Sequence, residues 1–169
     1  MEHIDSLINR VKGISIAHEM LSRSQWAPIS LYKLADRIIH SLNHLIPNDR
    51  EIVSKINPSK IFLDADQSHS IAIIINELFS NSIEHAAKVG EVILVDLNII
   101  SENGEIKFVY KDNGPGFPEN VLKSEFKNVG MYLIKNIVEQ SLRGSMKIEN
   151  RDGARIEIEF PGGSNLEEL

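Results

Sequence analysis

The segment IAIIINELFSNSIEHAA, from Ile71 to Ala87, decides the fold. Apolar and small side chains recur on one side of a predicted helix: Ile71, Ile74, Ile75, Leu78 and Ser82. Polar side chains three or four residues apart form another side: Glu77, Asn81, Glu84 and His85. A carboxylate one turn before a carboxamide suits a hydrated divalent cation, because both groups offer hard oxygen ligands. A capped, solvated helix face would carry the same residues, so this segment alone leaves both interpretations open.

A second segment, DNGPGF from Asp112 to Phe117, follows an alternating run that predicts a strand ending in a tight loop. Glycines in such a loop let the backbone approach a ligand closely, and Asp112 supplies a carboxylate that can accept a hydrogen bond from a purine amino group. Asp-Asn-Gly is also ordinary turn chemistry. The two segments in this order, with strands between them, are stronger evidence than either one.

Together the two segments resemble the GHKL nucleotide-binding fold. NELFSNSIEHA is similar to its N box, and DNGPGF is similar to its first glycine box. The chain most resembles the catalytic domain of sensor histidine kinases with an N-E-L-x-x-N motif, over roughly Ile29 to Pro161. The resemblance implies an α+β fold, a two-layer α/β sandwich. In this fold helices cover one face of a mixed, mostly antiparallel sheet, and here an N-terminal amphipathic helix is added.

Composition limits the class of protein. The chain has 169 residues, 42% hydrophobic and 25% charged, which is enough for one full domain and an appended element. A net charge of −6 without a long run of lysine or arginine argues against nucleic acid as a partner. The absence of cysteine excludes disulfides, and no apolar stretch approaches the roughly 20 residues that span a bilayer. We expect a cytoplasmic protein, or the cytoplasmic part of a larger sensor in the membrane.

The first residues, Met1 to Ser24, predict an amphipathic helix with one apolar stripe, which either pairs in a coiled coil or bundle or docks on the following domain. Within it, RVKGISIAHEML resembles the second helix of the kinase dimerisation region. We therefore expect residues 1–28 to be that helix and a linker, 29–161 the ATP-binding domain, and 162–169 a flexible tail. By the same resemblance, the helix that carries the phosphoacceptor histidine is absent, and the intact kinase is a homodimer.

His18 precedes Glu19, and a neighbouring acid can orient a phosphoacceptor imidazole. The proline that usually follows such a histidine by five or six residues is missing, because the first proline is Pro28. A structural or regulatory role for His18 is the favoured interpretation.

The remaining elements follow from period and turn signals. A second helix is expected from Ile29 or Ser30 up to Pro47. Asp64, Asp66 and Ser68 are the residues expected to supply the N-cap of the N-box helix. Strands are predicted at 51–56, 60–63, 92–100, 105–111, 145–149 and 154–160. The strand at 92–100 is apolar at nearly every position, which predicts cover on one face and part of the other. A last helix runs from Gly130 through Val138.

The resemblance assigns roles to the two quoted segments. Asn81 would ligate Mg²⁺ that bridges the ATP phosphates, and Asp112 would accept from the adenine amino group. Gly114 and Gly116 would let the loop pass the base, which Phe117 would line. Glu77 stands where relatives keep the base that positions water, or it orients the accepting imidazole.

NVGMYLI resembles the second glycine box, which places Gly130 and Met131 at the nucleotide. The polar segment before it resembles an ATP lid, in which Lys123 and Lys127 either reach the γ-phosphate or stay solvated. His85 either contacts phosphate or packs. Ile83 either lines the base pocket or lies in the core, and the core is the favoured interpretation. Three positions depart from the family pattern: Glu84 replaces a basic residue, Asn128 a glycine and Ala154 a threonine.

The first hypothesis is the ATP-binding catalytic domain of a sensor histidine kinase. It would move the γ-phosphoryl of Mg-ATP to a histidine and then to a response regulator. Without an acceptor helix, the chain alone should bind ATP without autophosphorylation. The alternative is a regulatory, pseudokinase or anti-sigma-like module that binds nucleotide and a protein partner. Plain ATPase activity of the gyrase type is disfavoured, because the transducer domain those enzymes need is not in this sequence.

Overall fold

The computed structural model describes residues 2–86, 90–126 and 129–163. Its main sheet has five strands in the order β2-β4-β5-β7-β6. β2 (Glu51–Ile56) runs parallel to β4 (Val92–Glu102). β5 (Glu105–Asp112), β7 (Ala154–Pro161) and β6 (Ser145–Asn150) continue the sheet antiparallel. The predicted mixed, mostly antiparallel sheet is confirmed.

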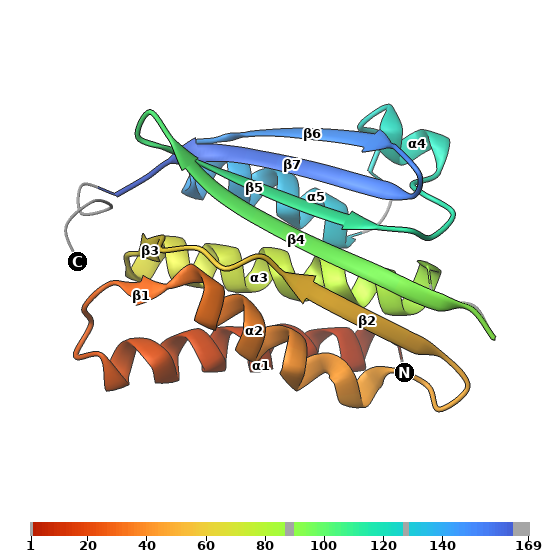
Figure 1. Ribbon diagram of the computed structural model, residues 1–169, viewed down its shortest axis with the longest axis horizontal. Coiled ribbons are helices and arrows are strands. Elements are labelled where there is room, and N and C mark those ends of the chain that lie inside the picture. The colour runs from red at the N-terminus through yellow and green to blue at the C-terminus, as the bar shows by residue number, and fades with distance from the viewer. Residues whose placement is uncertain (1, 87–89, 127–128, 164–169) are drawn as a thin grey trace.

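Helices form the second layer, as Figure 1 shows. α3 (Ala65–Asn81) runs beneath the sheet, and α1 (Glu2–Arg23) and α2 (Leu31–Leu42) pack against it. α5 (Val129–Asn136) also contacts α3, and the short α4 (Glu119–Leu122) precedes it in the chain. A two-stranded sheet joins β1 (Ile29–Ser30) to β3 (Phe62–Leu63). Further single turns are 3-10 helix at Asn43–Leu45 and π-helix at Ser82–Ala86 and Ile137–Ser141.

Local capping sets the helix starts. Ser30 caps α2 by accepting from the backbone N–H of Lys33, and Asp64 caps α3 by accepting from that of Gln67 at 2.8 Å. Of the three residues predicted to cap α3, Asp64 is the N-cap, while the Ser68 hydroxyl donates to the Asp64 carbonyl. The turn between β4 and β5 has positive φ at both Asn103 and Gly104, which is the conformation that this dipeptide favours.

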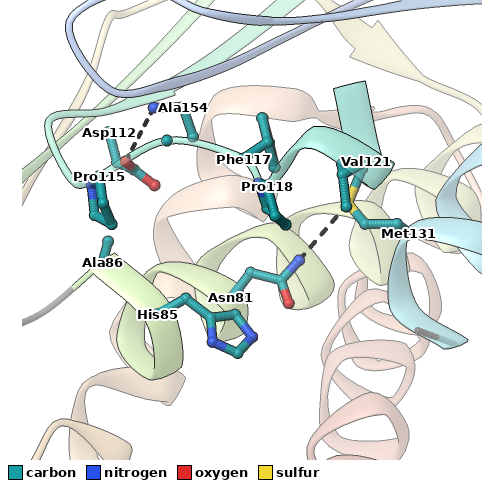
Figure 2. A pocket seen from close by; sticks show the side chains of 11 residues that line it. Asn81, His85, Ala86, Asp112, Pro115, Phe117, Pro118, Val121, Met131 and Ala154 are labelled. Atoms are coloured by element: carbon teal, nitrogen blue, oxygen red, sulfur yellow. Dashed lines mark hydrogen bonds between the residues drawn. The ribbon is translucent and has the colours of Figure 1, made fainter. Parts of the chain in front are cut away.

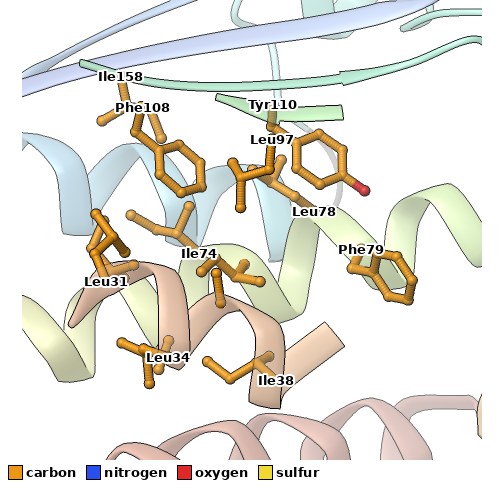
Figure 3. Close-up of a cluster of buried hydrophobic side chains, with 14 of the residues drawn as sticks. Leu31, Leu34, Ile38, Ile74, Leu78, Phe79, Leu97, Phe108, Tyr110 and Ile158 are labelled. Atoms are coloured by element: carbon orange, nitrogen blue, oxygen red, sulfur yellow. The ribbon is translucent and has the colours of Figure 1, made fainter. Parts of the chain in front are cut away.

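The core lies between α2, α3 and the inner face of the sheet (Figure 3). The predicted packing side of α3 is confirmed, because Ile71, Ile74, Ile75 and Leu78 are buried, as is Ser82 just beyond it. Side chains from β4, β5 and β7 meet them from above, among them Leu97, Phe108 and Ile158.

The strand predicted at 92–100 is covered on one face as expected, and on its second face only Asp96 and Asn98 are half-buried. Alternate residues of β4 are buried, but Val92 and Leu94 on the other face are 45% and 53% exposed. The helices of the described residues lie on one side of the sheet, so its outer face meets solvent. Apolar residues on that face hid the alternation from sequence analysis.

α1 docks on α3 and α2, which is one of its two predicted uses. Ala17 and Leu21 are completely buried, and Gly13 packs against the backbone of Ala72 and the side chain of Asn76. Four other residues of the apolar stripe face outward: Leu7, Ile8, Val11 and Ile14. Among the described residues, no helix is both long enough and apolar enough to cross a membrane.

Candidate nucleotide site

A cavity of about 330 Å³ opens where the C-terminal end of α3 meets the loop after β5 (Figure 2). Its walls come from the π-helical turn after α3, the 112–118 segment, α4, and the starts of α5 and β7. Most lining side chains are apolar, with a few polar groups at separate points. The residues are Asn81, His85, Ala86, Asp112, Pro115, Gly116, Phe117, Pro118, Val121, Met131 and Ala154.

Asp112 lies at one end of this cavity and is 6% exposed. Its Oδ1 accepts from the backbone N–H of Gly114 at 3.0 Å and of Ala154 at 3.4 Å, and its Oδ2 accepts from Ser82 Oγ at 2.7 Å. A carboxylate has about four lone-pair sites, so these three bonds leave one on Oδ2. Asp112 is therefore a fixed acceptor for a ligand amino group.

Tyr110 supports this acceptor from behind. Its hydroxyl lies 2.9 Å from Ser82 Oγ, and because Ser82 donates its single hydrogen to Asp112, Tyr110 donates to Ser82. Burial, with the Asp112 charge nearby, raises the pKa of the Tyr110 phenol above its ordinary value. The phenol stays protonated and the Tyr110–Ser82–Asp112 chain keeps one direction.

Both glycines of the 112–117 loop are needed because neighbouring residues lie too close for a side chain at either position. A Cβ on Gly114 would lie 2.5 Å from the Ala86 Cβ. Gly116 has φ +86°, and a side chain there would meet Asn150 at 2.6 Å. Asn150 holds the loop, since its Oδ1 accepts from the Phe117 N–H and its Nδ2 donates to the Phe117 carbonyl.

Asn81 and Met131 form the opposite side of the cavity. Asn81 Nδ2 donates to Met131 Sδ at 3.8 Å, and within the described residues nothing donates to Asn81 Oδ1. His85 lies one turn on, 69% exposed in its side chain and 3.8 Å from Glu84. The described residues contain no cluster of three His, Cys, Asp or Glu that would hold a metal alone. One amide oxygen instead fits a cation that takes its other ligands from phosphates and water.

Glu77, the candidate base, lies outside the cavity lining and is 6% exposed. Arg10 of α1 donates to both of its carboxylate oxygens, with Nη2 to Oε2 at 2.9 Å. A Cβ on Gly130 would be 2.6 Å from Glu77 Oε2, so the start of α5 lies directly against this carboxylate. Sequence analysis missed Arg10 at this site, because 67 residues separate it from Glu77.

The structure brings most predicted site residues together. Asn81, His85, Asp112, Gly116, Phe117 and Met131 line the cavity. Gly114 holds the Asp112 side chain, and Gly130 lies against Glu77. The predicted Lys127 and the Asn128 departure fall outside the described residues. Lys123 is 60% exposed and pairs with Glu119, and Ile83 is buried as expected for core.

Four lining residues were not named in sequence analysis as part of the site: Ala86, Pro115, Pro118 and Val121. A fifth, Ala154, was noted there as a departure from the family pattern. Pro115 and Ala86 adjoin predicted residues, so proximity in sequence was an available signal. Val121 had none, because it is the apolar residue of a short α4 within a polar segment and is buried at 3% exposure.

Comparisons with known proteins agree with this geometry. A family model described as histidine kinase-, DNA gyrase B-, and HSP90-like ATPase matches residues 66–164, more than half of the chain. Sensor histidine kinase PdtaS of Mycobacterium tuberculosis is 27% identical over 165 residues, covering 92% of this chain and 32% of that protein. Sensor histidine kinase ComP of Bacillus subtilis is 29% identical, covering 79% and 18%. The chain spans a third or less of the length of these curated relatives.

Solved structures show the same fold. The histidine kinase domain from the Erythrobacter litoralis EL346 blue-light activated histidine kinase superposes with a TM-score of 0.81 at 20% identity, over 95% of this chain and 81% of that one. The catalytic domain of histidine kinase ThkA superposes with a TM-score of 0.66 at 16% identity, over 80% of this chain and 95% of that one. The predicted fold class is confirmed, including its helix-covered sheet.

Proposed function

The chain belongs to the family of histidine kinase-, DNA gyrase B- and HSP90-like ATPases, and from this premise we propose that it is the ATP-binding catalytic domain of a sensor histidine kinase. It would bind Mg-ATP and supply the γ-phosphoryl group for transfer to a histidine. The observation that carries the proposal is the placement of Asp112 and Asn81 on opposite sides of one largely apolar cavity.

The Asp112 end suits adenine. An apolar cavity with a single oriented acceptor is what a flat base with an exocyclic amino group needs. The lone pair that Asp112 Oδ2 keeps after its bond from Ser82 can accept from that amino group. Phe117 and the backbone at Gly116 would lie along the base.

The Asn81 end suits phosphates and a cation. Asn81 Oδ1 would hold Mg²⁺, which supplies charge neutralisation for the phosphates when bound. Gly130 and Met131 lie in the first turn of α5, and the N-terminal end of a helix favours an anion. Glu77 would orient the accepting imidazole or take its proton. His85 is exposed beside this end and would contact phosphate there.

The partners follow from the same proposal. A histidine-bearing helix would accept the phosphoryl group, and a response regulator would receive it next. The relatives described as sensor histidine kinases support this reading. We expect the acceptor helix to be supplied from elsewhere in a cytoplasmic, homodimeric kinase, so the chain alone should bind ATP without autophosphorylation.

One observation favours a second candidate, a regulatory module that binds nucleotide without transferring phosphate. Both oxygens of Glu77, the candidate base, are occupied by Arg10. A carboxylate that is hydrogen-bonded to arginine through both oxygens is less able to take a proton from the accepting histidine. A histidine-bearing helix added with labelled ATP separates the two candidates, because labelling of the helix is expected only for the kinase.

The primary experiment is calorimetric titration of Mg-ATP into the wild type and Asn81→Ala. We expect micromolar-range binding that needs Mg²⁺ and is lost in Asn81→Ala. Asn43→Ala is the matched control, because Asn43 is exposed at the end of α2, away from the cavity. Absence of binding to the wild type would contradict the proposal and leave a regulatory role that needs no nucleotide.

A further inference from the structure

Arg10 and Glu77 form an ion pair between α1 and α3 that neither helix needs for its own formation. The guanidinium donates through Nε and Nη2 to the two carboxylate oxygens, which is the bidentate geometry of strong pairs. The side chains are only 19% and 7% exposed. The hydrogen bond to Glu77 raises the pKa of Arg10 above its ordinary value, so the guanidinium stays charged.

The pair lies beside the end of the cavity where the triphosphate would be. Glu77 is one helical turn before Asn81, and its Oε2 is close enough to Gly130 that a Cβ there would come within 2.6 Å. Its negative charge is therefore next to both the proposed cation ligand and the start of α5. Without a partner, a poorly solvated carboxylate at this point would repel an incoming triphosphate.

We propose that Arg10 is a positioning residue of the nucleotide site, which neutralises and holds Glu77 so that a triphosphate can bind beside it. Helix α1 then contributes a side chain, Arg10, to the nucleotide site. This inference rests on the proposed function, because it concerns the triphosphate end of the same cavity.

The docking of α1 fixes where Arg10 lies. One turn after Arg10, Gly13 lies against α3 at ordinary contact distance, with its ideal Cβ position 3.5 Å from the Asn76 Cβ. Ala17 and Leu21 continue the contact as fully buried residues. The Arg10 guanidinium therefore reaches Glu77 from a helix that is held along more than two turns.

A double-mutant cycle on Mg-ATP affinity tests the proposal. Arg10→Ala leaves Glu77 uncompensated and should weaken Mg-ATP binding by about ten- to a hundredfold. Glu77→Gln removes the repelling charge and should strengthen binding, and the double variant should return near the wild type. Arg10→Lys keeps the charge but loses the two-pronged contact, so an intermediate loss is expected.

Two controls distinguish an effect of charge on triphosphate binding from general damage to the fold. Adenosine carries no phosphate, so its affinity should be the same in the wild type and in Arg10→Ala. Arg23→Ala removes another α1 arginine, which is 75% exposed, and should leave Mg-ATP affinity unchanged. Equal losses for adenosine and ATP in Arg10→Ala would mean a merely structural role and would overturn the proposal.

A reversible cross-link tests the part played by α1. The chain has no cysteine, and the Gly13 and Asn76 Cβ positions are at a separation that disulfides adopt. The oxidised Gly13→Cys/Asn76→Cys variant should bind Mg-ATP as tightly as its reduced form, since docked α1 presents Arg10 correctly. Loss of binding on oxidation, with recovery on reduction, would show that α1 must leave and would overturn the proposal.

The two proposals fail in different ways. If the wild type binds neither Mg-ATP nor adenosine, the proposed function itself is wrong. If the wild type binds Mg-ATP and Arg10→Ala binds it equally well, only the role of Arg10 is wrong.

Discussion

Asp112 shows how several weak determinants fix one side chain. Two backbone N–H groups and one hydroxyl hold its carboxylate, and Tyr110 orders the hydroxyl in turn. A turn-forming aspartate needs fewer partners than this. The extra bonds leave a single acceptor direction toward the cavity, which is the property that a base-recognition site requires.

Replacing Asp112 with asparagine tests that role at the residue scale. The amide keeps the side-chain volume and can still accept on one atom while donating to Ser82, so we expect a folded protein. Loss of the charged acceptor should weaken ATP binding by about 1.5–3 kcal/mol. Calorimetric titration measures this, with Asp96→Asn on the outer face of β4 as the control. An unchanged ATP affinity would mean that Asp112 does not contact the adenine base.

The site residues that sequence could predict share one property, which is that they lie in three short contiguous segments, the N box and the two glycine boxes. Asn81, Asp112 and Gly116 each belong to a motif whose chemistry is readable without the fold. Arg10 belongs to no such motif, and its partner is decided only when α1 packs on α3. Val121 became part of the wall because the polar segment around it forms a short helix.

At the scale of elements, sequence predicted well those helix starts and turns that are determined by the residues at the boundary itself. Asp64 and Asn103-Gly104 carry capping and turn chemistry in their own side chains and backbone. The exposure of β4 has a non-local cause, since it depends on which face of the sheet the helices cover. The two possible uses of α1 were left open for the same reason.

The docking of α1 makes a stability prediction. Leu21 is fully buried against the domain, so Leu21→Ala should lower the free energy of unfolding by about 2–5 kcal/mol. Val11 is on the same helix but 61% exposed, and Val11→Ala should change it by less than about 0.5 kcal/mol. Urea unfolding followed by circular dichroism compares them. Equal, small effects would mean that α1 is not packed on the domain in solution.

At the scale of the whole molecule, charge is arranged on the sheet face that carries no helix. Lys107 of β5 pairs with Glu157 and Glu159 of β7, and Arg155 pairs with Glu149 of β6 and with Glu157. These ion pairs join the three strands in register, beside the exposed Ile100 of β4, which lies opposite Lys107. The face stays solvated while its strands are tied together, opposite the layer that carries the nucleotide site.

This network predicts how stability depends on pH. The Lys107 hydrogen bond, with help from Arg155, lowers the pKa of Glu157 below its ordinary 4.5, and Lys147 and Arg155 lower that of Glu149. A carboxylate whose pKa is lower in the folded state stabilises fully above the unfolded value and loses that contribution as pH falls through the folded one. The wild type should therefore lose stability on acidification below about pH 4.5 more steeply than Glu157→Gln. Urea unfolding at a series of pH values measures both, with Glu102→Gln at the end of β4 as the control that should follow the wild type. Parallel curves for the wild type and Glu157→Gln would mean that the ion pairs of Glu157 with Lys107 and Arg155 do not persist in solution, and that β5 and β7 are held together without them.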